Sequence, residues 1–203
     1  MFAPESVAVI GATERPGSVG RALLENLKSY RAPVYPVNRK RHRVLGVPAF
    51  PEVGAIPDHV ELAIVATPAA TVPDVVEECA AAGVTGAVVV SAGFRECGPV
   101  GAKLEGAIAA RRGQMRIVGP NCFGVMIPRL SLNATFAPLL AKDGHLAFVS
   151  QSGALCSSVL GVEQAVVSPA AISITATPAW CSCPDRTAHA RLRRPDAIDN
   201  GST

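Results

Sequence analysis

The chain has 203 residues, of which 49% are apolar and only 4% are aromatic, and its formal net charge is +3. This length suffices for one full domain and part of a second, and the composition suits an α/β core better than an all-β sandwich. The small net charge gives no argument for nucleic acid, and no apolar run approaches the roughly 20 residues that a membrane helix needs. We therefore expect neither a nucleic-acid partner nor a membrane partner.

The N-terminus and the cysteines indicate a cytoplasmic protein. Residues 1–6 (MFAPES) contain no basic segment and no long apolar run, so we expect no signal peptide. The six cysteines are irregularly spaced, which is typical of reduced thiols rather than of a disulfide framework. Cys181 and Cys183 form a C-x-C pair, but no second pair completes a zinc set, and we expect no metal site.

In chain order, short apolar strands alternate with helices. The expected strands cover residues 6–10, 34–37, 62–66, 86–91 and 116–118. The expected helices cover residues 18–30, 73–82 and 101–112. In the first two helices, the residues expected to face the core are Val19, Ala22, Leu23, Leu27, Val72, Val75, Val76 and Cys79.

These strands are apolar throughout, without a polar alternation, which is typical of strands buried on both faces. Consecutive β-α-β units are joined by right-handed crossovers. The sequence therefore predicts a Rossmann-like α/β domain over residues 1–125, with a parallel sheet and helices on both of its faces.

The rest of the chain is less regular. Residues 126–143 are interpreted as a linker. A strand at residues 144–150 and a helix at residues 153–160 would open a second, incomplete domain of flavodoxin-like type. Residues 161–203 show neither helical nor strand periodicity, and we expect an aberrant, poorly ordered tail there.

The loop after the first strand is rich in glycine. Gly11 ends the strand, and Gly17 and Gly20 bracket the start of the following helix. The spacing fits neither the dinucleotide fingerprint G-x-G-x-x-G nor the Walker loop. Amide groups at a helix N-terminus favour an anion, and Thr13 and Ser18 add hydroxyl donors. The loop predicts a phosphate site; the alternative is a glycine-rich turn without a ligand.

The stretch YPVNRKRHR after the second strand indicates which phosphate is bound. NAD-binding domains place a carboxylate there. This chain instead has Asn38, followed by Arg39, Lys40, Arg41 and Arg43. Cations suit a nucleotide with an additional phosphate on its ribose, as in NADP or coenzyme A (CoA). The alternative interpretation is a solvated basic loop.

Seven motifs occur in an order that is similar to one known family. They are VAVIGATERPGSVG, YPVNRK, LAIVATPA, VVVSAGF, MRIVGPNCFG, LNATF and FVSQSGAL. They resemble the CoA-binding domain of NDP-forming acyl-CoA synthetases, a group that includes succinyl-CoA synthetase α subunits and ADP-forming acetyl-CoA synthetases. The match runs from Ser6 to Leu160.

The resemblance implies that CoA binds at the carboxyl ends of the strands. The residues implied to bind it are Gly11, Thr13, Gly17, Ser18, Val19, Gly20, Asn38, Lys40, Thr67, Pro68, Ser91, Ala92, Gly93, Phe94, Pro120 and Asn121. Lys40 falls where the family keeps a basic residue for the nucleotide. Cys122 would lie near the thiol end, and we interpret it as a packed thiol rather than as a nucleophile.

The resemblance also implies an activity. In this family, acid, CoA and NTP are converted to acyl-CoA, NDP and phosphate through a phosphorylated histidine. The turn formed by Ser150, Gln151, Ser152 and Gly153 resembles the helix N-terminus that cradles this phosphohistidine. ATP or ADP would bind only to a β-type subunit or a fused ATP-grasp domain, which is the implied partner.

The family's histidine motif does not occur in this chain, whose four histidines are His42, His59, His145 and His189. We therefore identify no catalytic residue and expect the chain alone to be inactive. It resembles the CoA-binding portion of a synthetase whose second domain is cut off, by a shifted reading frame or a truncated gene. A chain ending near Leu130 is then expected to be more soluble than the full chain.

Two other functions stay open at this point. A non-catalytic CoA-binding or sensing module, as in protein-lysine acetyltransferases, needs no phosphorylated histidine. An NADP-dependent oxidoreductase domain fits the basic loop, but the sequence offers no candidate for a hydride-transfer site.

Overall fold

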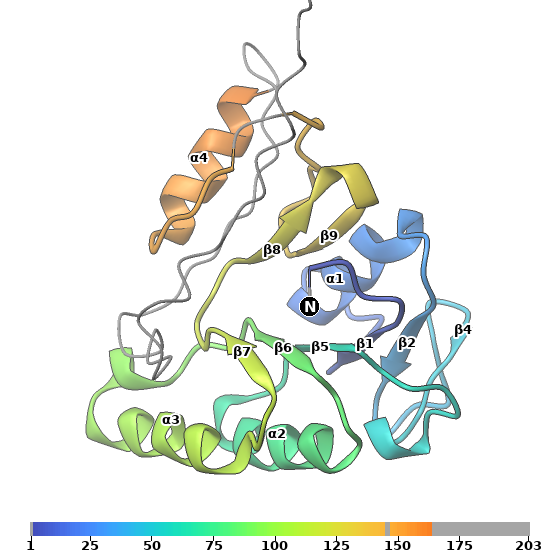
Figure 1. Ribbon diagram of the computed structural model, residues 1–203, viewed down its shortest axis with the longest axis vertical. Helices are drawn as coiled ribbons and strands as arrows, with labels where there is room; N and C mark the ends of the chain where they lie inside the picture. Colours follow the sequence, from blue (N-terminus) through green and yellow to red (C-terminus); the bar gives the residue numbers. More distant parts are fainter. Residues whose placement is uncertain (1, 145–146, 164–203) are drawn as a thin grey trace, which may run out of the picture.

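The computed structural model describes residues 2–144 and 147–163, and its central feature is a five-stranded parallel sheet (Figure 1). The strands lie in the spatial order β2-β1-β5-β6-β7. Their bounds are β1 (Val7–Ile10), β2 (Val34–Val37), β5 (Leu62–Val65), β6 (Gly86–Val89) and β7 (Arg116–Val118). The predicted parallel sheet is confirmed, and each predicted strand ends within two residues of the observed one.

Two helices cover one face of this sheet. Figure 1 shows α2 (Val72–Ala81) and α3 (Pro99–Arg111) side by side below the strands. Each helix has a proline in its first turn, where the missing N–H has no intrahelical partner to lose. The buried residues that α2 contributes to this layer are Val72, Val75, Val76 and Cys79. The predicted inward face of this helix is therefore confirmed.

The other face is covered by one helix and a β-hairpin. The helix is α1 (Val19–Asn26), which a 3-10 turn (Leu27–Ser29) extends. The hairpin consists of β8 (Gly124–Ile127) and β9 (Leu132–Thr135), joined by a 3-10 turn (Pro128–Leu130). Leu132 of β9 packs with Leu23 and Leu27 in the core on this side of the sheet.

This hairpin lies where the sequence predicted the start of a linker over residues 126–143. The prediction of helices on both faces is confirmed, because α1 lies on this face and α2 and α3 on the other. The strands of the hairpin have four residues each, and a proline-containing turn separates them, so they lack the two-residue turn by which hairpins are recognised in a sequence. The predicted inward position of Val19 is also wrong, because α1 begins there and the side chain is 40% exposed.

A second, smaller hairpin follows β2. It consists of β3 (Arg43–Val44) and β4 (Val47–Pro48), and Phe50 then returns to form a bridge with Val37 at the end of β2. The basic loop predicted after β2 is thus part of a folded hairpin. Within the described ranges, no helix combines the length and the apolar composition that crossing a membrane requires.

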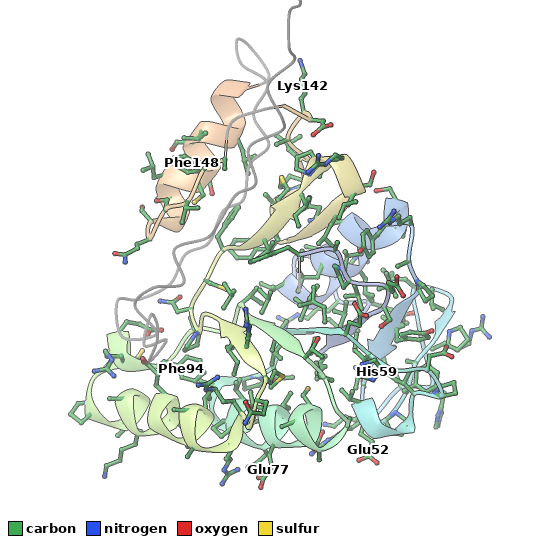
Figure 2. The ribbon with its side chains drawn as sticks, in the orientation of Figure 1. Glu52, His59, Glu77, Phe94, Lys142 and Phe148 are labelled. Atoms are coloured by element: carbon green, nitrogen blue, oxygen red, sulfur yellow. The ribbon has the colours of Figure 1, made fainter. Side chains whose placement is uncertain are left out.

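The last described element is α4 (Gly153–Glu163), which confirms the helix predicted at residues 153–160. Cys156 and Leu160 of α4 pack with Phe123 and with Phe148, which Figure 2 shows beside the helix. The strand predicted at residues 144–150 is not formed by its described residues, because none of the described sheets offers it a neighbour to pair with. The tail predicted at residues 161–203 lies, beyond residue 163, outside the described residues.

Candidate functional site

The order of the strands defines where a ligand can bind. From β1 the chain proceeds outward to β2 on one side, and from β5 it proceeds to β6 and β7 on the other. The connections therefore diverge between β1 and β5, and ligands of open α/β sheets bind at such a point, outside the carboxyl ends of the strands. All sixteen predicted cofactor residues lie in the segments that follow these five strands, at most ten positions after a strand end, and two of them, Val19 and Gly20, form the first turn of α1.

Two cavities at this edge of the sheet meet at Thr67 and Pro68, which line both of them. The smaller one, the β2-side cavity, has a volume of about 440 Å³. It is lined by Ile10, Gly11, Val37, Asn38, Arg39, Lys40, Pro51, Thr67, Pro68, Thr71, Asp74, Val75 and Glu78. The larger one, the α4-side cavity, has about 780 Å³. Its walls comprise Val19, Ala66, Thr67, Pro68, Val90, Ser91, Ala92, Asn121, Cys122, Phe123, Phe136, Gln151, Gly153, Ala154 and Ser157. We call the two together the groove.

A third cavity of about 480 Å³, the α1-end cavity, lies at the start of α1. Gly17 and Ser18 line it together with Val19 and Phe136, and the last two also line the α4-side cavity. The three cavities therefore form one continuous series from the end of β2 to the start of α4.

Two glycines allow α1 to start directly against the end of β1. Gly11 has a positive φ of 90°, and a Cβ there would lie 2.6 Å from the carbonyl oxygen of Ala66. A Cβ on Gly20 would lie only 2.1 Å from the carbonyl oxygen of Gly11. The first intrahelical bond runs from the Ala22 N–H to the Ser18 oxygen (3.1 Å), and the Ser18 N–H donates to the Arg15 oxygen (3.3 Å). The amides of Val19, Gly20 and Arg21, between these two, are therefore the ones available to an anion.

The glycine-rich loop is fastened by Glu14. One carboxylate oxygen accepts from the backbone N–H of Leu45 and the other from the guanidinium of Arg41, both at 3.0 Å. The Arg21 guanidinium also donates to the carbonyl oxygen of Glu14 at 2.9 Å. The β3–β4 hairpin and α1 therefore hold this loop in place from both sides.

Asn38 joins the end of β2 to the same loop. Its amide nitrogen donates to the carbonyl oxygen of Ala12 at 2.7 Å, and its amide oxygen accepts from the backbone N–H of Lys40 at 2.8 Å. Asn38 thus positions two loops of the β2-side cavity instead of presenting a carboxylate to a ribose.

The cations after β2 are not equivalent. Arg39 is paired with Glu78, and Arg41 is paired with Glu14. Among the described residues, Lys40 has no carboxylate partner, although it lines the β2-side cavity. Arg43 donates to the carbonyl oxygen of Gly46 and does not line this cavity, so among the described cations of the cavity wall the Lys40 ammonium is the one that stays available to an anionic ligand.

A buried hydroxyl without a partner lies where the two cavities of the groove meet. Thr67 Oγ1 is buried and has no hydrogen-bond partner in the described part of the chain. The backbone around it is well fixed, since Ser91 Oγ donates to the Thr67 oxygen at 2.6 Å and the Asn121 N–H donates to the Ser91 oxygen at 2.8 Å. Buried polar groups are rarely left unpaired, so this hydroxyl fits a polar ligand in the groove.

Cys122 lines the α4-side cavity but is only 3% exposed. Its thiol donates to the carbonyl oxygen of Val89 at 3.1 Å. Burial raises the pKa of the Cys122 thiol to about 12, so the thiol stays protonated at neutral pH. The interpretation as a packed thiol is therefore confirmed.

Several predicted residues line none of these cavities and have other roles. The Phe94 side chain is fully buried in the core, near the start of α3 (Figure 2), and Pro120 is buried as well. The structure therefore gives Phe94 a role in supporting the loop after β6 instead of direct contact. The predicted residues outside the cavity walls are Thr13, Gly20, Gly93, Phe94, Pro120, Ser150 and Ser152.

The predicted SQSG turn forms the N-terminus of α4. Ser152 Oγ accepts from the Leu155 N–H at 3.3 Å, and Ser150 Oγ accepts from the Ser152 N–H at 3.0 Å. These bonds cap the helix, while Gln151 and Gly153 line the α4-side cavity. The turn is thus in place to offer amide groups at the far end of the groove.

Sequence reasoning missed the aromatic wall of the α4-side cavity, formed by Phe123 and Phe136. Phe136 closes the LNATF motif, which was the available signal but carried no assigned role. Of the histidines, His42 and His59 are exposed and line none of the three cavities, whereas His145 and His189 lie outside the described residues. Over the described ranges, no group of three His, Cys, Asp or Glu side chains could hold a metal ion.

Comparison with known proteins identifies the family of this domain. Residues 5–128 match the family model described as a CoA binding domain. The chain is 46% identical over 162 residues to the ADP-forming acetate–CoA ligase I of Archaeoglobus fulgidus, covering 79% of this chain but 24% of that enzyme. It is 43% identical over 169 residues to the α subunit of ADP-forming acetate–CoA ligase I from Pyrococcus furiosus, covering 79% of this chain and 37% of the subunit.

The fold agrees with these relatives. The dinucleotide forming acetyl-coenzyme A synthetase 1 of Ca. Korarchaeum cryptofilum, in its apo form, superposes with a TM-score of 0.80 at 35% identity, covering 85% of this chain and 39% of that chain. The chain thus spans between about a quarter and two fifths of the length of the proteins it matches. With its groove at the carboxyl edge of the sheet, the chain belongs to the CoA binding domain family and resembles ADP-forming acetate–CoA ligases in the region that contains this domain.

Proposed function

We propose that this chain binds CoA in the groove, with the nucleotide in the β2-side cavity and the pantetheine arm in the α4-side cavity. The observation that carries the proposal is the meeting of the two cavities at Thr67, between an unpaired lysine at one end and a helix N-terminus alongside. An elongated ligand with a phosphorylated ribose, a pyrophosphate and an apolar arm has the chemistry that this arrangement recognises.

The residues fit the parts of CoA in order. Lys40 would pair with the ribose 3′-phosphate, and the amides at the start of α1, beside Gly17 and Ser18, would donate hydrogen bonds to the pyrophosphate. The buried hydroxyl of Thr67 would form a hydrogen bond with the pantetheine arm of the ligand. Ser91 and Asn121 would line the path of the arm. The other predicted residues would support the loops that carry these contacting groups.

We further propose that the chain is the CoA-binding portion of an NDP-forming acyl-CoA synthetase, in which acid, CoA and NTP give acyl-CoA, NDP and phosphate. The support is its similarity to ADP-forming acetate–CoA ligases from two archaea. Because one relative is an α subunit, the proposed partner is a β-type subunit or ATP-grasp domain, which would bind ATP or ADP. Without that partner we expect no complete reaction from this chain.

The N-terminus of α4 would cradle the phosphorylated histidine of such an enzyme. Gln151 and Gly153 border the α4-side cavity, so the phosphoryl group and the end of the CoA arm would meet there. The proposed CoA-binding domain comprises residues 1–125, the range inferred from sequence, together with the rest of the β8–β9 hairpin, and a second domain would start at residues 144–160. A cytoplasmic location accords with four described cysteines that form no disulfide, Cys79, Cys97, Cys122 and Cys156.

Titration calorimetry on the 203-residue chain tests the CoA site. We expect tighter binding of CoA than of dephospho-CoA, which lacks the 3′-phosphate, or of NADP. In Lys40→Ala, the affinity for CoA should fall about tenfold, to the level of dephospho-CoA, because one charge-assisted contact is lost. Lys103→Ala removes the same charge from the exposed surface of α3 and should change neither affinity.

The competing functions give different results. Tight NADP binding without CoA binding would support an oxidoreductase domain and refute the proposal. CoA binding that Lys40→Ala leaves unchanged would place the nucleotide elsewhere on the chain.

A further inference from the structure

Phe136 is an aromatic side chain that the structure leaves half exposed between two cavities. It is 41% exposed and lines both the α4-side and the α1-end cavity. Val19, the first residue of α1, is 40% exposed and lines the same two cavities. Two large apolar side chains thus flank the passage from the helix N-terminus into the groove.

The ring of Phe136 is held on one side by a second ring. Phe123 packs against it edge-to-face, with centroids 5.0 Å apart and an interplanar angle of 68°. Phe123 itself is buried, in a cluster with Met126 and Cys156. Aromatic pairs of this geometry prefer a fixed mutual orientation, so Phe136 has a defined position although it is exposed.

The backbone on both sides of Phe136 is fixed by buried polar side chains. Thr135 Oγ1 donates to Asn133 Oδ1 at 2.7 Å, and Asn133 Nδ2 donates to the carbonyl oxygen of Ala137 at 3.2 Å. Asn26 of α1 donates to the carbonyl oxygens of both Thr135 and Ala137 at 2.7 Å. A paired polar network of this kind specifies one backbone conformation.

This network anchors β9 to α1, and the residue between its anchor points is Phe136. The LNATF motif therefore has a physical reading: its asparagine and threonine fix the chain so that its phenylalanine protrudes beside the start of α1. An ordinary core phenylalanine would be buried, and an ordinary loop residue would not need two buried polar side chains to hold it.

We propose that Phe136 and Val19 form an apolar clamp for the branched dimethyl group of the pantetheine arm of CoA. This inference rests on the proposed CoA site. In CoA, the first apolar group beyond the pyrophosphate is the quaternary carbon with its two methyl groups. A pyrophosphate at the start of α1 brings that group to the passage between Phe136 and Val19, where burial of both surfaces stabilises the complex.

Affinity measurements with two ligands test the clamp. CoA carries the dimethyl group, whereas 3′-phospho-ADP has the same nucleotide and pyrophosphate without the arm. Phe136→Ala should weaken CoA binding about tenfold and leave 3′-phospho-ADP binding within twofold of the wild-type chain. Leu139→Ala is the matched control, because Leu139 is 38% exposed on the same segment but lines none of the three cavities; it should change neither affinity.

Each other result overturns the clamp. Equal loss for both ligands would mean that Phe136 supports only the helix end, and loss for acetyl-CoA but not CoA would place an acyl group there. If both ligands bind and Phe136→Ala changes neither, the clamp is refuted while the CoA site stands. If the wild-type chain binds neither ligand, the CoA site itself fails.

A second variant keeps the test valid if Phe136→Ala does not fold. Phe136→Leu keeps an apolar side chain, and we expect it to lose CoA affinity by less than Phe136→Ala. If only this variant folds, the same comparison of CoA with 3′-phospho-ADP decides the question, with unchanged circular dichroism as the check on folding.

Discussion

At the level of single residues, Thr67 has opposite effects on the stability of the unliganded chain and on the proposed binding of CoA. Its hydroxyl is buried and has no partner among the described residues, whereas its carbonyl oxygen accepts from Ser91 Oγ. An unsatisfied buried hydroxyl destabilises a fold. The residue therefore stabilises the unliganded chain less than an apolar isostere would.

Replacement by valine should show this in two measurements. In Thr67→Val we expect the free energy of unfolding in urea to stay equal or rise by about 1 kcal/mol, because the desolvated hydroxyl is removed. CoA affinity should fall about tenfold by calorimetry. The control is Thr85→Val, which removes an exposed hydroxyl that donates to the Glu61 oxygen at 3.0 Å; it should destabilise by about 1 kcal/mol without affecting CoA. A less stable Thr67→Val with normal affinity would contradict this account.

The Glu96 carboxylate makes the stability of the loop after β6 depend on pH. Burial alone would raise the pKa of the Glu96 carboxyl, but backbone N–H groups, Gly93 among them at 2.7 Å, outweigh it and hold the pKa below its usual 4.5. A depressed carboxyl pKa means that the group stabilises the fold above pH 4.5, and that this contribution is lost as the pH falls through the folded-state value.

Thermal melting of Glu96→Gln across pH 3–7 checks the sign. The wild-type chain should melt higher than the variant near neutral pH, and the difference should shrink below pH 4.5, where the wild-type carboxyl takes up its proton. A difference that stays constant from pH 7 to pH 3 would show that the Gly93 contact does not depend on the charge.

At the level of elements, the junction of β1 and α1 determines the geometry of the groove. In Gly20→Ala, the new Cβ would lie 2.1 Å from the Gly11 oxygen and would push α1 away from the end of β1. We expect a loss of about 1–3 kcal/mol in the free energy of unfolding, as for an overpacked core, and a lower CoA affinity.

The matched control lies in α3. A Cβ on Gly106 would meet nothing within 4 Å, so Gly106→Ala should stabilise the chain by about 0.5–1 kcal/mol through helix propensity. Equal effects of the two alanines would refute the close approach of α1 to β1.

How well each helix or strand could be predicted from the sequence depends on whether local residues or distant contacts stabilise it. The strands of the sheet were predicted within two residues because continuous apolar runs between glycines and prolines report burial on both faces. The β8–β9 hairpin was missed because its stability comes from packing on α1, which no local pattern records. The helix predicted at residues 153–160 is present as α4, while the strand predicted before it has no described neighbour.

At the level of the whole molecule, the hairpin decides where the first domain ends. Leu132, Ala134 and Thr135 of β9 are fully buried against α1 and the sheet, so a chain ending near Leu130 would lose part of its core. The structure therefore moves the boundary beyond the one inferred from sequence. Ala141 is also tied to the hairpin, through its N–H and the sulfur of Met126 at 3.2 Å.

Two shortened chains test this boundary. A chain of residues 1–142 should melt cooperatively, close to the full chain, whereas a chain of residues 1–130 should melt lower and be less soluble, because apolar core surface is exposed. The readouts are the thermal midpoint and the soluble fraction after expression. A 1–130 chain that melts as high as the 1–142 chain would show that β9 contributes nothing to the fold.

The site as a whole could be predicted only in part. Residues that follow parallel strands must meet at one edge, so the sequence brought most of the groove together. The sequence could not show that Glu14 and Glu78 neutralise two of the neighbouring arginines and leave Lys40 unpaired, since these pairs form across separate elements. It also could not show that Phe136 protrudes, because Asn26 fixes the chain on both sides of this residue through bonds to positions more than a hundred residues later.

The fastening of the glycine-rich loop by Glu14 has a kinetic consequence. Because both carboxylate oxygens already hold the loop, an arriving ligand has little backbone to order and needs no slow closure of this segment. Stopped-flow traces of association should then be single exponentials whose rate rises linearly with ligand concentration, and variants should differ mainly in how fast the complex dissociates.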